Sequence, residues 1–125
     1  MSRILIGGMG TSSFEHITLK THKAILNTHK VFLRTKVHKS AAEILALRPD
    51  AESFDKIYDE CDNFEQVYDK ISDIIVAQSL QEDILYLVPG SAVFAENTVQ
   101  LIINKAEQKN IEVEIIPSVS FLDAI

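Results

Sequence analysis

The chain of 125 residues is short enough to form one domain and long enough to bury one hydrophobic core. Hydrophobic residues make up 46% of it and charged residues 24%, and no apolar run approaches the roughly 20 residues of a membrane span, so we expect a globular protein without a membrane partner. The net charge of −6 argues against general nucleic-acid binding. The charges are unevenly distributed, since residues 1–48 contain eight Lys/Arg and two acidic residues, whereas residues 49–125 contain four Lys/Arg and sixteen acidic residues. A local basic patch in the first part of the chain is therefore compatible with the acidic total.

Residues 3–6 predict a first strand, which ends in a loop that contains Gly7, Gly8 and Gly10. Glycines in such a loop let the backbone approach a ligand or adopt positive φ. The loop lacks the G-x-G-x-x-G fingerprint of dinucleotide-binding proteins, because Ser13 stands where the third glycine belongs, and it lacks the Gly-Lys-Ser/Thr of a P-loop. Dinucleotide binding is therefore disfavoured.

The next two predicted elements are a helix and a second strand. Thr18 is a suitable N-cap for a helix that runs to about Asn27. Four residues are expected on the inner side of that helix: Leu19, His22, Ile25 and Leu26. Residues 31–33 then predict a strand, which leads into the basic segment 34–39.

Two helices and a third strand are predicted between residues 40 and 79. Ser40 and Glu43 have the spacing of a capping box for a helix over residues 44–47. Residues 54–58 suit a short strand. Residues 62–65 then predict an N-terminal cap with a reciprocal contact from the Glu65 side chain. This cap starts the clearest helix of the chain, whose inner-side residues recur at helical spacing: Phe64, Val67, Tyr68, Ile71, Ile74 and Ile75.

The segment 83–99 is the centre of the prediction. Residues 84–88 form a continuous apolar run, which is typical of a strand buried on both faces of a sheet. The run stops at Pro89, and a helical pattern begins after Ser91. In open α/β sheets, ligands bind at the carboxyl ends of such strands, so residues 89–94 are the leading candidate for a ligand loop. An ordinary strand-to-helix turn is the alternative interpretation.

The last elements complete an alternating order. Asn110 is suited to end a helix in left-handed geometry, and residues 111–116 alternate as an edge strand with Glu112 and Glu114 on one face. Five strands with helices between them predict a three-layer α/β/α fold around a five-stranded parallel sheet. Residues 121–125 suggest the first turn of another helix, so we expect a longer protein of which this is the front part.

Few residues offer chemistry of their own. The four histidines lack partners at metal-ligand spacing, so neither a metal site nor a catalytic residue is predicted. Cys61 lies between two acids, which disfavours a reactive thiolate, and one unpaired cysteine fits a cytoplasmic protein. Any catalysis must then rest on positioning, and methyl transfer from a sulfonium cofactor is such a reaction.

Several segments resemble those of a known family, in the same order along the chain: the glycine loop followed by residues 17–19, VFLRTKVH (31–38), FEQVYDKI (64–71), LVPGSAVFAENTVQLI (87–102) and EVEIIPSVSFLDAI (112–125). The family is that of the tetrapyrrole (corrin and porphyrin) methylases. The chain is most similar to the methylase-like module that precedes a MazG-type nucleotide pyrophosphohydrolase domain in bacteria. The resemblance implies that residues 1–125 are the first of two α/β domains, which bind S-adenosylmethionine in the cleft between them.

The resemblance also implies which residues contact the cofactor. They lie in three loops: Gly7, Gly8, Gly10, Pro89, Gly90, Ser91, Val93, Phe94, Ser118 and Ser120. Ser91 and Ala92 replace the usual Asp-Pro of the family, and Ser118 replaces a glycine. From their place after a strand, Arg34, Lys36 and Lys39 are predicted to meet the carboxylates of an anionic substrate, with Arg34 and Lys36 as the leading binding residues and a solvated basic edge as the alternative.

Two functional hypotheses follow. The first is the cofactor-binding half of an S-adenosylmethionine-dependent methyltransferase that acts on a small molecule such as an anionic tetrapyrrole. In this case the isolated 125 residues should fold and form a two-fold homodimer, but should not turn over substrate. The second is a non-catalytic module that regulates or scaffolds an attached nucleotide pyrophosphohydrolase.

Overall fold

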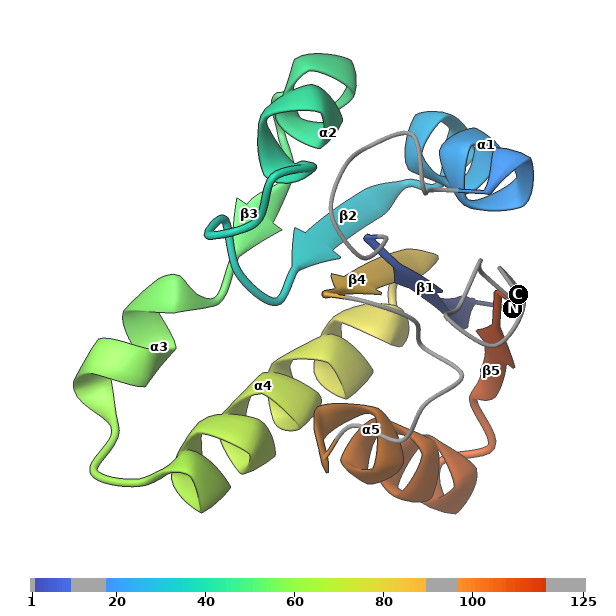
Figure 1. Cartoon of the computed structure of the whole chain (residues 1–125). Helices are drawn as coiled ribbons and strands as arrows, with labels where there is room; N and C mark the ends of the chain where they lie inside the picture. The colour runs from blue at the N-terminus through green and yellow to red at the C-terminus, as the bar shows by residue number, and fades with distance from the viewer. Residues whose placement is uncertain (1, 10–17, 90–96, 117–125) are drawn as a thin grey trace, which may run out of the picture.

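The chain forms one sheet of five parallel strands in the order β3-β2-β4-β1-β5 (Figure 1). The computed structural model describes residues 2–9, 18–89 and 97–116. The strands are β1 (Arg3–Gly8), β2 (Lys30–Leu33), β3 (Glu52–Ser53), β4 (Ile84–Val88) and β5 (Glu112–Ile115). The predicted five-stranded parallel sheet is confirmed.

Helices cover both faces of this sheet, which confirms the three-layer α/β/α prediction (Figure 1). They are α1 (Leu19–Asn27), α2 (Ala41–Leu47), α3 (Asp55–Glu60), α4 (Phe64–Ser79) and α5 (Asn97–Gln108). One hydrophobic core joins α1 and α2 to one face, and a second core joins α3, α4 and α5 to the opposite face. In the described part of the chain, no helix is both long enough and apolar enough to cross a membrane.

The central strand β4 has β1 on one side and β2 on the other, and all five of its residues are buried. Ile84, Tyr86 and Val88 belong to the core under α3, α4 and α5. Leu85 and Leu87 belong to the core under α1 and α2. Because helices cover both faces, each position of the strand is apolar, which explains the continuous run in the sequence.

Local signals for the ends of elements are largely confirmed. The side chain of Thr18 accepts a hydrogen bond from the backbone of Thr21 at 3.2 Å and caps α1. Asn110 has a φ of 58°, as expected for a residue that ends α5 in left-handed geometry. β5 lies at the edge of the sheet, and its residue Glu112 is exposed, as predicted.

The cap of α4 uses different residues from those predicted. The Asn63 side chain accepts a hydrogen bond from the backbone of Gln66 at 2.9 Å, and the Gln66 side chain accepts one from the backbone of Asp62 at 3.1 Å. The reciprocal contact therefore comes from Gln66 and not from Glu65. The helix begins one residue later than the capping-box spacing suggested, which moves the third helical position to Gln66.

The strand predicted over residues 54–58 is wrong, since this segment starts helix α3. β3 ends at Ser53, and Phe54 packs its ring on Phe32 at 5.0 Å between centroids. The buried residues Phe54 and Ile57 are three positions apart, which is a helical spacing that is hard to recognise in so short a segment.

Three residues predicted on inner helix faces are exposed instead. Leu19 and Leu26 of α1 are 70% and 47% exposed, and Phe64 at the start of α4 is 66% exposed. In α1 the buried positions are Thr21 and Ile25, so the inner face is rotated relative to the prediction. The shift follows from a close contact between α1 and β1.

Gly7 makes this close contact possible. It lies inside β1 opposite Leu87, and a Cβ atom added to it would be 3.1 Å from the Leu87 side chain and 3.4 Å from the Thr21 side chain. A glycine at this position lets α1 approach the sheet with a small polar residue, Thr21, fully buried against it. Gly7 is thus a packing residue of the strand, and the prediction that it belongs to the loop is wrong.

Arg48 closes the end of α1 from outside the helix. Its guanidinium donates to the backbone carbonyls of Ile25, Thr28 and His29, and it forms an ion pair with Asp50 at 2.9 Å. The hydrogen bond from Arg48 lowers the pKa of the Asp50 carboxyl to about 2. Asp50 is 56% exposed, so solvent weakens the contribution of the pair to stability.

We expect Gly7→Val to lower the free energy of unfolding by ~1–3 kcal/mol, because the added methyl groups overlap Leu87 and Thr21. Urea denaturation measures this change. Adding Leu87→Ala to Gly7→Val should cost less than the sum of the two single changes, since the smaller side chain relieves the overlap. Equal stability of Gly7→Val and the unsubstituted chain would contradict the close contact.

Asp50→Asn should lower stability at neutral pH by no more than ~1 kcal/mol. The folded-state pKa of Asp50 lies below its ordinary value, so its contribution is present above about pH 4 and is lost as the pH falls through about 2. The stability difference between Asp50→Asn and the unsubstituted chain should therefore shrink over this range. A difference that stays constant from pH 6 to pH 2 would argue against the ion pair.

Candidate functional site

The chain leaves the neighbouring strands β1 and β4 on opposite faces of the sheet. After β1 it enters α1 on one face and returns as β2, and after β4 it reaches α5 on the other face and returns as β5. Diverging connections of this kind open a crevice at the carboxyl ends of the two strands, where open α/β proteins bind ligands. Gly8 and Val88 are paired at the ends of β1 and β4, so this rule places a ligand site beyond these two residues.

Met9 joins three connections at this crevice. Its backbone N–H donates to the Val88 carbonyl at 2.7 Å, which extends the pairing of β1 and β4 by one residue. Its own carbonyl accepts a hydrogen bond from the Ser40 hydroxyl at 2.8 Å, at the start of α2. Met9 and Ser40 are both fully buried. The segments that follow β1, β2 and β4 are therefore held to one another where they leave the sheet.

The capping box predicted for α2 is wrong, because Ser40 makes this long-range contact instead. Its side chain makes no capping hydrogen bond to α2. Its backbone N–H donates to Nδ1 of His38 at 3.0 Å. The partner of the Ser40 hydroxyl lies 31 residues away in the sequence, so local spacing carries no signal for it.

The structure describes three of the ten predicted cofactor positions. Gly8 is the last residue of β1, and Pro89 follows β4 directly and is half-buried, so both lie at the mouth of the crevice. Gly7 lies one residue inside β1 and packs against α1, away from that mouth. The other seven positions lie outside the described residues: Gly10, Gly90, Ser91, Val93, Phe94, Ser118 and Ser120.

Arg34 follows the carboxyl end of β2, next to β4. Its backbone N–H donates to the Leu87 carbonyl at 2.9 Å, and its guanidinium donates to the Tyr58 hydroxyl of α3 at 3.2 Å. The side chain is half-buried, so the charge is held at the sheet edge and does not extend freely into solvent. Sequence reasoning missed Tyr58 as a partner because it assigned that residue to a strand.

Asp55 orders the basic segment after Arg34. Its carboxylate accepts hydrogen bonds from the Thr35 hydroxyl at 2.6 Å and from the Lys36 backbone at 2.9 Å. Burial raises the pKa of Asp55, but these hydrogen bonds outweigh burial, and the pKa is lowered from its ordinary value. The Lys36 side chain is exposed. Arg34 and Lys36 thus lie just after the carboxyl end of β2, as predicted. The Arg34 side chain contacts Tyr58, and the Lys36 side chain is exposed to solvent.

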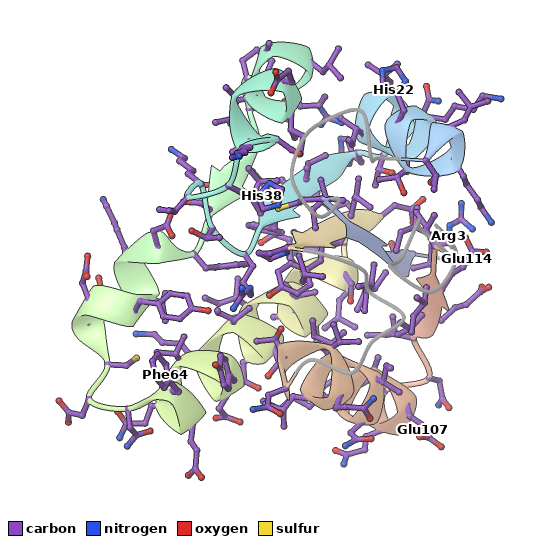
Figure 2. All side chains as sticks on the ribbon, viewed as in Figure 1. Arg3, His22, His38, Phe64, Glu107 and Glu114 are labelled. Carbon is purple, nitrogen blue, oxygen red and sulfur yellow. The ribbon has the colours of Figure 1, made fainter. Side chains whose placement is uncertain are left out.

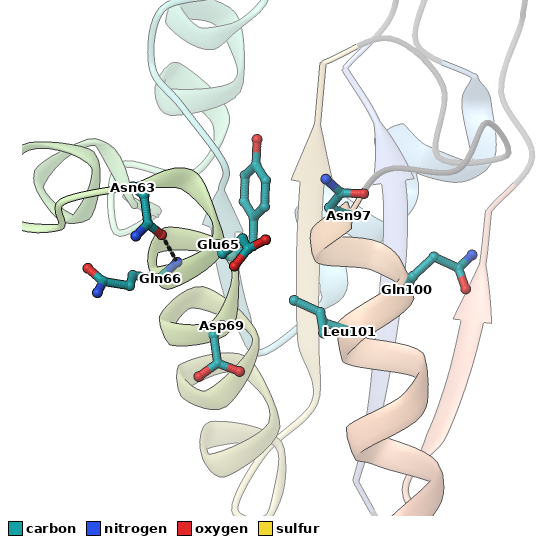
Figure 3. A pocket seen from close by; sticks show the side chains of 8 residues that line it. Asn63, Glu65, Gln66, Asp69, Asn97, Gln100 and Leu101 are labelled. Carbon is teal, nitrogen blue, oxygen red and sulfur yellow. Dashed lines mark hydrogen bonds between the residues drawn. The ribbon is translucent and has the colours of Figure 1, made fainter.

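A groove of about 710 Å³ lies between the N-terminal halves of α4 and α5 (Figure 3). Within the described part of the chain, its lining residues are polar except for Tyr68 and Leu101, and they are Asn63, Glu65, Gln66, Tyr68, Asp69, Asn97, Gln100 and Leu101. None of the predicted site residues in the described ranges lines this groove. The sequence carried no signal for it, because its walls come from two helices whose lining residues are 28 or more positions apart in the chain.

In the described ranges, no cluster of three or more His, Cys, Asp or Glu side chains is placed to hold an ion. Cys61 is a free, half-buried thiol directly after α3. The arrangement at the sheet edge consists instead of strand ends, backbone groups and one anchored guanidinium. It is suited to binding and aligning a ligand.

Comparison with solved structures shows the same fold in proteins of low sequence identity. The crystal structure of diphthine synthase has a TM-score of 0.73 and 18% identity, and it aligns with 96% of this chain and 45% of its own length. A putative diphthine synthase from Entamoeba histolytica has a TM-score of 0.71 and 22% identity, over 100% of this chain and 44% of its own. Uroporphyrin III C-methyl transferase from Thermus thermophilus has a TM-score of 0.66 and 17% identity, over 97% and 50%.

Sequence comparison gives the family. The uncharacterized protein YabN of Bacillus subtilis (strain 168) is 35% identical over 122 residues, which are 98% of this chain and 25% of YabN. The chain thus spans about a quarter of this curated relative and about half of the solved structures. The profile described as Tetrapyrrole (Corrin/Porphyrin) Methylases matches residues 3–125. The chain therefore belongs to the tetrapyrrole methylase family, as the resemblance predicted.

Proposed function

We propose that this chain is the cofactor-binding half of an S-adenosylmethionine-dependent methyltransferase. The observation that carries the proposal is the topology of β1 and β4, from which the connections to α1 and α5 leave on opposite faces of the sheet. Membership of a methylase family supports the choice of cofactor. In this proposal the protein is cytoplasmic and acts on a small molecule.

The described residues at the crevice fit such a cofactor. Gly8 places no side chain at the mouth, and Pro89 places neither a charge nor a long side chain there. The backbone of Met9 is fixed by hydrogen bonds to Val88 and Ser40, so the strand ends present a rigid wall. The cofactor supplies an activated methyl group, and the chain supplies binding, orientation and exclusion of water. The seven further positions implied by the family would complete its binding.

Arg34 and Lys36 are proposed to bind carboxylates of an anionic substrate, such as a tetrapyrrole. Tyr58 holds the Arg34 guanidinium, and Asp55 holds the backbone of Lys36, so both charges are presented from ordered groups. A planar guanidinium binds carboxylates in a bidentate geometry that a lysine cannot reproduce. Arg34 should therefore contribute more to orientation, and Lys36 more to attraction over distance.

A non-catalytic module is the second proposed function. The match covers only a quarter of YabN, which favours a role for this domain within a longer protein. Ser91, Ala92 and Ser118 depart from the family pattern at the cofactor loops. Such a module would regulate or scaffold an attached nucleotide pyrophosphohydrolase. Methyl transfer by the longer protein separates the two proposals, because only the first requires turnover.

Gly90→Val is expected to weaken S-adenosylmethionine binding by about tenfold or more, because a branched side chain after Pro89 prevents close approach of the backbone. Calorimetry on this chain joined to the second domain that the proposal implies measures the affinity. Gln81→Val is the matched control, since Gln81 is exposed and precedes the amino-terminal end of β4, at the end of the strand opposite to Gly90. Unchanged affinity in Gly90→Val would remove this loop from the site.

Arg34→Gln and Lys36→Gln should each weaken the binding of an anionic tetrapyrrole at low salt, and the loss should be larger for Arg34. Fluorescence quenching of the tetrapyrrole measures the affinity. Lys109→Gln removes the same charge from the opposite edge and is the control. Added salt should reduce the effect of Lys36→Gln more than that of Arg34→Gln, because the Lys36 side chain is exposed. If all three variants bound the tetrapyrrole with the same affinity, the basic segment would be a solvent-exposed surface without a role in substrate binding.

A further inference from the structure

Ser40 does not act as a serine at the start of a helix usually does. A serine at this position normally accepts a hydrogen bond from the first turn of its own helix and so stabilises it. The Ser40 side chain makes no such bond to α2, and its hydroxyl donates instead to the Met9 carbonyl, 31 residues away, at 2.8 Å. Positions where a local rule is broken in favour of a distant contact are expected at functional sites.

The backbone of Ser40 is fixed on both sides. Its N–H donates to Nδ1 of His38 at 3.0 Å, and its carbonyl accepts from the N–H of Ile44, in the first turn of α2, at 3.1 Å. Figure 2 shows His38 near the carboxyl end of β2. Ser40 is fully buried, so its hydroxyl is presented from an ordered backbone and is shielded from water.

The acceptor of this hydroxyl lies at the end of the neighbouring pair of strands. Met9 follows Gly8, the last residue of β1, and its N–H donates to the carbonyl of Val88, the last residue of β4, at 2.7 Å. Because a peptide group is planar, a donor to the Met9 carbonyl sets the orientation of that whole group. Ser40 therefore controls how the backbone leaves β1 beside the end of β4.

The bond between Ser40 and Met9 also joins the two sides of the central strand. β4 lies between β1 and β2 in the sheet, and Ser40 follows β2 whereas Met9 follows β1. Met9 is fully buried, so water does not readily replace the hydroxyl if it is removed. The Met9 carbonyl would then stay buried without this donor or would rotate away from its present direction.

We propose that Ser40 is a positioning residue of the cofactor site, and that its hydroxyl holds the Met9 backbone in the geometry that S-adenosylmethionine needs at the end of β1. Ser40 acts through Met9 and not by contact with the cofactor. The identity of the ligand rests on the proposed function, whereas the contact between Ser40 and Met9 is independent of it. The start of α2 is thereby given a role in cofactor binding.

The first test compares Ser40→Ala with Ser40→Thr by calorimetry, on this chain joined to the second domain that the proposed function implies. Ser40→Ala should weaken S-adenosylmethionine binding by about tenfold, because the Met9 carbonyl loses its donor. Ser40→Thr keeps the hydroxyl and should bind within about twofold of the unsubstituted protein, although its extra methyl group lowers stability in this buried position. Affinity should thus follow the hydroxyl and not the free energy of unfolding measured in urea.

Ser79→Ala is the matched control. Ser79 is 1% exposed, and its hydroxyl donates to the Val76 carbonyl at 2.7 Å in the last turn of α4, which precedes the amino-terminal end of β4. The variant removes the same buried group at the opposite end of that strand. It should lower stability, as Ser40→Ala does, but leave the affinity for S-adenosylmethionine unchanged.

The second test needs no cofactor and uses amide hydrogen exchange of the 125-residue chain. In Ser40→Ala the Met9 amide should exchange about tenfold faster, because its bond to Val88 opens more often once the carbonyl is released. The amides of Leu85 and Leu87, inside β4, should keep their exchange rates. Ser79→Ala should leave the exchange of Met9 unchanged.

Three outcomes would overturn the role of Ser40: an unchanged affinity in Ser40→Ala, an equal loss of affinity in Ser40→Ala and Ser40→Thr, or an unchanged exchange rate of Met9 in Ser40→Ala. Failure of the unsubstituted protein to bind S-adenosylmethionine is a different result. It contradicts the proposed function, whereas faster exchange of Met9 in Ser40→Ala would still support the hold of the hydroxyl on the Met9 backbone.

Discussion

The parallel pairing of β1 with β4 is the constraint on which the rest of the structure depends. It joins residues 4–8 to residues 84–88 in the middle of the sheet, and Met9 extends it by one further hydrogen bond to Val88. Once these strands are neighbours, right-handed crossovers must carry the chain to opposite faces, to β2 on one side and to β5 on the other. The two cores and the crevice between the strand ends follow from this single adjacency.

Features that depend on neighbours in the sequence were predictable. The run at 84–88, the cap at Thr18 and the left-handed residue Asn110 each express a local requirement, and each is where the sequence places it. Features that depend on contacts between residues far apart in the sequence were not predictable from it. Phe54 packs on Phe32 directly before helix α3, and in α1 Thr21, not Leu19, lies against Gly7 of the sheet.

The candidate site also has a part that was predictable from the sequence and a part that was not. The rule that ligands bind at the carboxyl ends of parallel strands was enough to select the segments after Gly8 and Val88. It did not give the contact between Ser40 and Met9 or the one between Tyr58 and Arg34, since each joins residues more than twenty positions apart. The groove between α4 and α5 has no sequence signature, because it exists only when the two helices pack.

The pairing of β1 with β4 also sets an order of events during synthesis. β1 is made before its partners β4 and β5, which are separated from it by about eighty and more than one hundred residues. Closing a loop of that length costs chain entropy before any contact repays it, and non-local pairings of this kind slow folding. Ile4, Leu5 and Ile6 must therefore wait, uncovered, until β4 has been made. β1 is consequently a late part of the sheet to assemble, and its apolar residues need protection from aggregation while the chain is nascent.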